Sequence, residues 1–244
     1  YTTLFRFLRH QEKTLYSKLL ELNNFEDLLD YFIGQIQEIC DFDGYYLAML
    51  QHSSEPSWLK IEKIFLDGPY HSMEQVLAQS KIQIKSETIL ENVLLKKKAY
   101  FLNKQSNYSY DEEFQLRFER WEIEEALVFP IMKEGQEPLG IFLLFSRGKE
   151  GKTGLEDKLL IIGELVSLFY YPLKHTYKIK KFQELEKDLL QKTKHNQAVM
   201  ELAQHMNNLS SVEKIITLIL KEITNLFHFD MALIRSEEHT SELQ

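Results

Sequence analysis

The pattern of apolar positions repeats at two places along the chain. Residues 22–47 and 209–234 align without gaps, and apolar residues recur in both at intervals of three or four, which predicts an amphipathic helix at the start of each. Each stretch also begins with a polar N-cap residue and a glutamate three positions on, the pairing of a capping box. These pairs are Asn23 with Glu26 and Ser210 with Glu213. The repeat predicts one whole domain followed by the opening of a second copy.

The same patterns predict the other elements of the first copy. Helical spacing predicts helices over 24–40 and 88–97 and a long helix from 155 to about 207. Alternating or continuous apolar runs predict strands over 45–51, 58–66 and 99–102, and a hairpin that pairs 126–132 with 139–146. Residues 53–56 are predicted to form a turn, and 110–121 a helical or mixed segment.

The hairpin carries the most specific motif of the chain. An apolar strand with Pro130 near its end is followed by a polar turn and by a second strand that opens with Leu139 and Gly140. This motif, the order of the elements and the start of the last helix at 155–160 resemble a GAF domain, a small sensory module of signalling proteins. The resemblance covers about residues 20–180 and, in truncated form, 209–234.

The resemblance implies a fold of the α/β (α+β) class. A central, mostly antiparallel sheet of about six strands would be flanked by helices, and a long connecting helix would follow it. The first and last helices of the domain would cover one face of the sheet. The other face would carry a ligand pocket under a lid made from the middle segment.

These features divide the chain into segments. Residues 1–20 are predicted to form an N-terminal helix, 21–180 the GAF-like domain, 181–208 a connecting helix, and 209–234 the start of a second, truncated copy. Residues 235–244 resemble the translation of a common short-read sequencing adapter, so we expect an artefact that packs against nothing. The chain opens on Tyr1, and we expect it to be cut from something longer.

Composition then excludes several classes of function. Asp and Glu number 37 against 29 Lys and Arg, and the net charge of −8 argues against a dedicated nucleic-acid binder. Cys40 is the single cysteine, which excludes a disulfide framework, a cysteine-based zinc site and a two-thiol redox cycle. The sequence shows no apolar run long enough to span a membrane. We therefore expect a cytoplasmic protein with no nucleic-acid partner.

Aromatic residues on the strand and lid segments are the candidates for a ligand pocket. Such side chains suit a small organic ligand, with core packing as the alternative for at least half of them. The candidates are Tyr46, Tyr70, Phe114, Phe118, Trp121 and Phe129. His52 and His71 have no second ligand at useful spacing, so no metal site is predicted, and the sequence identifies no cofactor.

Two ligand classes known from GAF domains are disfavoured. Asn103-Lys104 followed by Phe118 matches part of the cyclic-nucleotide motif, but the Asp of the closing Asp-Glu pair is missing. Bilin-binding GAF domains need a thiol in or beside the pocket. The neighbours of Cys40 place it in the core instead.

The connecting helix carries heptad spacing. The positions are Phe182, Leu185, Leu189, Lys192, Asn196, Val199, Ala203 and Met206. Phe182, Leu185, Leu189, Asn196 and Val199 form the predicted dimer seam, with Asn196 at an a position, where a buried Asn fixes register. We expect a parallel homodimer, although Lys192 at a d position weakens the seam. The alternative is an ordinary amphipathic linker helix.

The expected function follows from these features together. We expect a non-catalytic sensory and dimerisation segment of a bacterial signalling protein, which binds a small ligand and relays to an output domain outside this fragment. The alternative is a purely structural interaction module whose pocket is filled. An enzyme is disfavoured because the sequence shows no nucleophile–base pair and no metal cluster, and His175 and His195 lack a phospho-acceptor context.

Overall fold

The computed structural model describes most of the first copy and the helix that follows it. The described residues are 18, 21–51, 58–78, 80–104, 116, 118–148, 154–207, 214, 216–217, 219–221 and 224. Apart from Lys18, the predicted N-terminal helix lies outside them, as do His52, the turn at 53–56, Phe114 and residues 235–244. Within 209–234 the few described residues are helical, and the second copy stays a prediction.

Helix α2 (Phe25–Gln37) confirms the first predicted helix. Its N-cap is Asn24, whose side-chain oxygen accepts a hydrogen bond from the backbone N–H of Glu26 at 2.9 Å. The capping box predicted at Asn23 is therefore wrong by one residue. The apolar positions at three- and four-residue spacing give the helix one buried face, made of Phe25, Leu28, Leu29, Phe32, Ile33 and Ile36.

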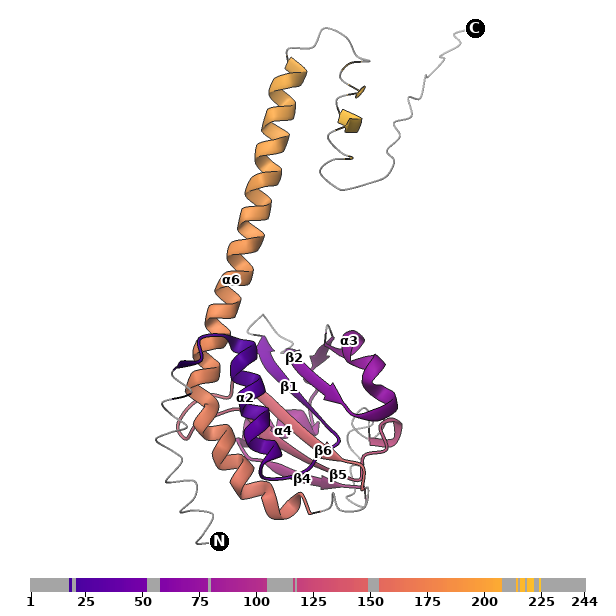
Figure 1. Cartoon of the computed structure of the whole chain (residues 1–244), viewed down its shortest axis with the longest axis vertical. Helices are drawn as coiled ribbons and strands as arrows, with labels where there is room; N and C mark the ends of the chain where they lie inside the picture. The colour runs from indigo at the N-terminus through magenta and orange to yellow at the C-terminus, as the bar shows by residue number, and fades with distance from the viewer. Residues whose placement is uncertain are drawn as a thin grey trace, which may run out of the picture. The chain divides into compact units, whose positions relative to one another are not determined.

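The five predicted strands lie in one six-stranded sheet, together with a short strand at 81–83 that the sequence analysis did not predict. Across the sheet they are β3 (Lys81–Gln83), β2 (Trp58–Leu66), β1 (Gly44–Gln51), β6 (Gly140–Ser146), β5 (Glu125–Pro130) and β4 (Tyr100–Asn103). Every neighbouring pair is antiparallel (Figure 1). Strands β1 and β6 lie in the middle and are buried on both faces, which explains why their sequences are apolar runs without clear alternation.

Gly140 fixes how closely β1 and β6 approach. It lies opposite Met49 in the ladder, and a Cβ atom at this position would come within 2.0 Å of the backbone oxygen of Ala48. That distance is far inside van der Waals contact, so a residue with a side chain would push the strands apart. The glycine of the hairpin motif is therefore required by backbone spacing.

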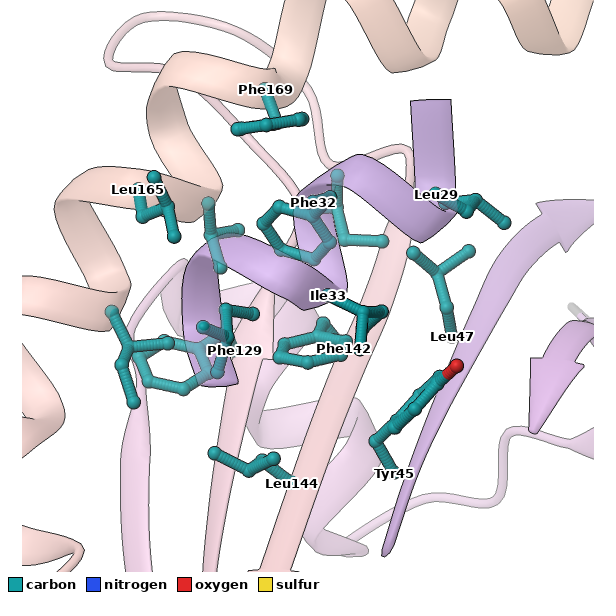
Figure 2. Packing of buried hydrophobic residues seen from close by; sticks show 14 of the residues in the cluster. Leu29, Phe32, Ile33, Tyr45, Leu47, Phe129, Phe142, Leu144, Leu165 and Phe169 are labelled. Atoms are coloured by element: carbon teal, nitrogen blue, oxygen red, sulfur yellow. The ribbon is translucent and has the colours of Figure 1, made fainter. Parts of the chain in front are cut away.

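One face of the sheet is covered by α2 and by the first part of α6 (Leu159–Asn207), which follows the short helix η2 (Glu156–Lys158). Figure 2 shows the aromatic centre of this packing. The Phe32 ring lies 5.2 Å from that of Phe142 and 4.6 Å from that of Phe169, measured between ring centroids. These contacts join α2, β6 and α6 and confirm that the first and last helices share one face.

The opposite face is covered by shorter elements. They are η1 (Gly68–Met73), α3 (Glu74–Leu77), α4 (Ile89–Lys96) and the described residues before β5. Thr88 caps α4 by accepting a hydrogen bond from the backbone N–H of Glu91 at 3.3 Å. A second set of buried apolar side chains, separate from the α2 side, fills this face.

Helix α6 confirms the long helix that the sequence predicts, with Pro172 inside it. The chain divides into two compact units after Lys178, so the helix contributes to both. Among the residues that the structure describes, no helix is both long enough and apolar enough to cross a membrane.

Candidate functional site

The predicted pocket residues divide between the two faces of the sheet. Tyr46, Phe118 and Trp121 are buried on the face opposite α2, and Tyr70 packs against them half-buried. Phe129 does not join them, because it lies on the α2 side, where Figure 2 shows it beside Phe142 and Leu165. Its inclusion in the set is corrected by this finding. Phe114 lies outside the described residues.

Arg147, which the sequence analysis did not single out, organises the face that holds Tyr46. It lies two residues after Phe145 and so projects from the same side of the sheet. Its Nε donates to the backbone oxygen of Trp121 at 2.9 Å, and its Nη1 donates to that of Asp67 at 2.7 Å. The guanidinium carbon lies 4.8 Å from the Tyr70 ring centroid and 5.7 Å from that of Phe145. One side chain thus ties the turn before η1 to the residues before β5.

A buried carboxylate positions Arg147. Asp43 is fully buried, and its Oδ2 accepts a hydrogen bond from the backbone N–H of Arg147 at 2.7 Å and another from the Ser146 hydroxyl at 3.4 Å. The backbone oxygen of Asp43 accepts from the N–H of Asp67 at 2.8 Å. Asp43 therefore fixes the end of β6 and the end of β2 at the same point.

Trp121 is held by stacking and by a turn. Its ring stacks on Phe145 with centroids 6.0 Å apart and planes inclined by 28°. The Phe145 ring in turn covers Gly44, where a Cβ atom would lie 2.2 Å from the ring. After Trp121 the chain reverses through Glu122, which has a left-handed φ of 54°, and the N–H of Ile123 donates to the Phe118 oxygen at 2.9 Å. The indole is thereby fixed against the sheet.

Among the described residues of this face, two side chains that can only donate each have a buried N–H group without a hydrogen-bond partner. The donor atoms are Nε1 of Trp121 and Nη2 of Arg147. Most buried polar groups in proteins are hydrogen-bonded, so an unpartnered pair of donors needs an explanation. An indole N–H and a guanidinium N–H can only donate, so each of the two needs an acceptor.

The other candidates of the sequence analysis have local roles. Nδ1 of His71 lies 3.1 Å from Oε1 of Glu74, the oxygen that also accepts from the N–H of Leu66. In the part of the chain that the structure describes, no group of three His, Cys, Asp or Glu side chains is placed to hold a metal ion. Lys104, from the partial cyclic-nucleotide motif, pairs with Glu124 at 2.9 Å, and this hydrogen bond raises the pKa of Lys104.

Cys40 lies on the α2 side of the sheet, partly buried against the apolar core there. Burial raises the pKa of its thiol to about 11, because the thiolate would lose its hydration. A thiol with this pKa is almost entirely protonated at neutral pH and is a poor nucleophile. This agrees with the expectation that Cys40 is a core residue.

A polar contact joins the sheet to the last turn of α6 in the first unit. The Tyr177 hydroxyl donates to Oε1 of Glu62 at 3.2 Å and accepts from Nε2 of Gln51 at 3.0 Å. The ring of Tyr177 packs on Phe25 with centroids 5.5 Å apart. Tyr177 therefore contacts α2, β1 and β2 one residue before the unit ends.

The predicted dimer seam is helical and exposed in the second unit. Phe182, Leu185, Leu189 and Val199 have exposed fractions between 56% and 69%, and Asn196 is also exposed. Ion pairs and hydrogen bonds within the helix occupy neighbouring polar residues, such as Lys181 with Glu184 at 2.9 Å. Large apolar side chains at this exposure are unusual on a protein surface when they form a stripe.

The arrangement of the first unit decides the fold. Six antiparallel strands in the order β3-β2-β1-β6-β5-β4 carry α2 and α6 on one face and short helices on the other. The described residues between 21 and 178 form a GAF-like domain. Arg147 and Trp121 lie on the face of this sheet that is opposite α2.

Comparison with known proteins places GAF domains among the structural matches. The GAF domain of a two-component sensor histidine kinase from Bacillus halodurans is 17% identical, with a TM-score of 0.48 over 65% of this chain and 99% of that one. A GAF domain/HD domain protein from Geobacter sulfurreducens is 15% identical, with a TM-score of 0.49 over 65% and 97%. At these values the matches say nothing about ligand or activity. No family profile and no curated protein matches the sequence.

The residues that the sequence analysis missed left only weak signals. Arg147 continues the alternation of Phe145, and this periodicity places it on the side of the sheet opposite α2. Asp43 aligns with Asp230 in the predicted repeat, but this alignment does not indicate its hydrogen-bond partners. Nothing in the sequence links Tyr177 to Glu62, because the two residues are 115 positions apart.

Proposed function

We propose that this chain is a sensory and dimerisation segment of a bacterial signal-transduction protein. A small ligand binds on the sheet face that holds Arg147 and Trp121, and α6 relays the bound state to an output domain outside this fragment. The segment itself is non-catalytic and acts in the cytoplasm. GAF-like folds serve several roles, so the fold alone does not identify the function, and the contacts below support it.

The burial of the apolar side chains changes along α6, and this change supports the proposal. From Leu159 to Lys178 the apolar side chains of the helix face the domain core, among them Leu165, Phe169 and Leu173. Beyond Lys178 the apolar side chains at heptad positions are exposed. The first part of the helix packs in the domain core, and the next part exposes a stripe of apolar side chains. Such a stripe favours packing against a second helix.

A second copy of the same chain suits this stripe. In a parallel pair, Lys181 at a g position lies across from Glu186 at the following e position of the partner copy, a complementary charge pair. Asn196 would meet its own copy and fix the register. Lys192 would also meet its copy, at a d position, and this repulsion keeps the pair from being permanently stable.

The contact of Tyr177 with Glu62 and Gln51 supports the relay. It connects the two strands β1 and β2 to the last turn of α6 in the first unit. A ligand that moves these strands by differential contacts would shift the helix between two arrangements. The ligand face and the helix are thereby linked through the sheet.

Sedimentation of the chain tests the dimer with a matched pair of variants. Leu189 and Leu190 are 56% and 57% exposed, but only Leu189 occupies the heptad seam. We expect the chain to sediment as a dimer at micromolar concentration, Leu189→Glu to weaken the dimer at least about tenfold, and Leu190→Glu to leave it nearly unchanged. Circular dichroism checks that both variants keep the thermal transition of the sheet.

Two results would contradict this dimer. One is a monomer at high concentration before any substitution. The other is equal weakening by Leu189→Glu and Leu190→Glu, because it would mean that general exposure of apolar residues, and not the heptad seam, drives association.

The alternative, a structural module with a filled pocket, rests on the burial of the site by the protein alone. Phe118 and Trp121 are 5% and 4% exposed without any ligand. If this alternative holds, no small organic molecule shifts the melting temperature of the chain. The ligand titrations described next distinguish the two functions.

A further inference from the structure

We infer that the ligand of this face carries an oxyanion, a carboxylate or a phosphate, which binds between Nη2 of Arg147 and Nε1 of Trp121. The inference rests on the ligand site of the proposed function and names the chemistry that the site selects.

Hydrogen-bonding capacity is the first argument. Arg147 uses Nε and Nη1 on backbone oxygens and leaves Nη2 buried without an acceptor, as Trp121 leaves its Nε1. Neither side chain has any acceptor atom. These two N–H groups can be satisfied only by acceptor atoms, and an oxyanion offers several acceptor atoms in one group.

Charge is the second argument. The guanidinium donates to two neutral carbonyl oxygens, and among the described residues no carboxylate forms an ion pair with it. The nearby carboxylate of Asp43 accepts from the backbone N–H of Arg147 and from Ser146. A half-buried cation attracts an anion more strongly than an exposed one does, since water screens it less.

The side chains around Arg147 and Trp121 indicate the chemistry of the rest of the ligand. Arg147 lies against the rings of Tyr70 and Phe145, and Trp121 stacks on Phe145. Phe145 and Trp121 are 0% and 4% exposed, whereas Tyr70 is half-buried, so the Tyr70 ring is the surface that suits a planar organic body attached to the oxyanion. Arg147 and Tyr70 are both only half-buried, so the site is reached from the surface near the Asp67–Tyr70 turn.

Binding there would also act on the fold. Arg147 already holds the backbone of Asp67 and of Trp121, which belong to different covering segments. An oxyanion that draws Nη2 toward itself would tighten both segments onto the end of β6. The same residue would therefore bind the ligand and transmit its presence to the sheet.

Calorimetric titration of the full chain with three small probes tests this inference. The probes are benzoate, phenyl phosphate and the uncharged benzyl alcohol, which share one ring and differ in the attached group. We expect benzoate or phenyl phosphate to bind at least about tenfold more tightly than benzyl alcohol, since hydrogen bonds to charged groups are the stronger ones. Whichever anion binds more tightly identifies a carboxylate or a phosphate as the preferred group.

The variants locate the effect. Arg147→Gln should abolish the preference for the anionic probes, whereas Lys104→Gln, which removes an exposed charge of the same sign, should leave it unchanged. Trp121→Phe keeps an aromatic ring and removes the N–H, so we expect a loss of at least about threefold. If Arg147→Gln fails to fold, Arg147→Lys replaces it and should also lose most of the preference, because lysine has no second N–H arm.

The fluorescence of Trp121 gives an independent localisation. The chain has two tryptophans, so Trp58→Phe leaves Trp121 as the single indole reporter. We expect benzoate to change its emission with the same affinity that calorimetry measures. If benzyl alcohol and the two anions bind with equal affinity, the inference is wrong, but the proposed ligand site is still supported. Failure of all three probes to bind at millimolar concentration would overturn both.

Discussion

The two faces of the central sheet are built from similar apolar residues but differ in the polar groups that they bury. On the α2 side, the buried cluster contains aliphatic and aromatic side chains from α2, the sheet and α6, and its most polar member is Tyr45. On the opposite side the buried cluster surrounds Arg147 and contains Trp121, with donor atoms that lack partners. A buried donor without a hydrogen-bond partner lowers the free energy of unfolding, so this second face is not optimised for stability.

We interpret the first face as the one that stabilises the fold and the second face as the one that holds the proposed site. Two long helices cover the first face, and their rings interlock around Phe32 (Figure 2). Short elements cover the second face, and one arginine ties two of its segments together. Residues that break the rules of core packing are expected at functional sites, where the rest of the domain supplies the missing stability.

The largest expected effect contrasts the two faces directly. Phe142→Ala should lower the free energy of unfolding by about 3–5 kcal/mol, because it empties the centre of the α2 side. Trp121→Phe should lower it by less than about 1 kcal/mol, since the loss of ring volume is offset by removal of an unpartnered buried donor. Urea unfolding of both variants measures the difference. Equal losses would show that both faces contribute to stability in the same way.

A smaller effect is expected at the contact between sheet and helix. Tyr177→Phe removes the hydroxyl that contacts Glu62 and Gln51 and should lower the free energy of unfolding by about 1–3 kcal/mol. Tyr171→Phe, at an exposed position of the same helix, should change it by less than about 0.5 kcal/mol. Thermal unfolding compares the two. A Tyr171→Phe effect as large as that of Tyr177→Phe would rule out a special role for the contact.

The smallest effect concerns charge on the α2 side. Burial raises the pKa of Cys40 from 9.0 to about 11, so between these pH values the unfolded chain loses a proton that the folded chain keeps. Stability is therefore full below about pH 9 and falls as the pH rises toward 11. The pKa of Tyr45, raised from 10.0 to about 12 by burial, extends the loss to higher pH.

Cys40→Ala should remove the part of this loss that begins near pH 9 and leave the part due to Tyr45. Urea unfolding at pH 8, 9, 10 and 11 measures both chains. A pH dependence that is identical with and without the thiol would show that Cys40 does not titrate across folding.

The sequence predicted α2, α4, α6 and five of the six strands because their signals are local, whereas the short elements η1, α3 and β3 were not predicted. Apolar periodicity located α2, α4 and α6, and the hairpin motif located β5 and β6 within a few residues. The N-cap was misplaced by one residue because Asn23 and Asn24 are both good caps, and only the backbone conformation selects between them.

The candidate site was harder to predict, for two physical reasons. Strand β5 is buried on both faces, so its continuous apolar run does not reveal that Phe129 points toward α2 while Val128 points the other way. The partners of Arg147 lie 26 and 80 positions away in the sequence, and no local pattern connects them. Tyr46, Phe118 and Trp121 lie in one buried cluster, and their role in binding a ligand stays a prediction.

The close approach at Gly140 has a consequence for how such domains diverge. The space between the strands there admits only a hydrogen atom, so drift at this position is blocked by backbone geometry and not by side-chain chemistry. The glycine of the hairpin motif is therefore kept for reasons of strand spacing alone. Two descendants of one ancestor can keep this glycine while the rest of the domain diverges in sequence and in role.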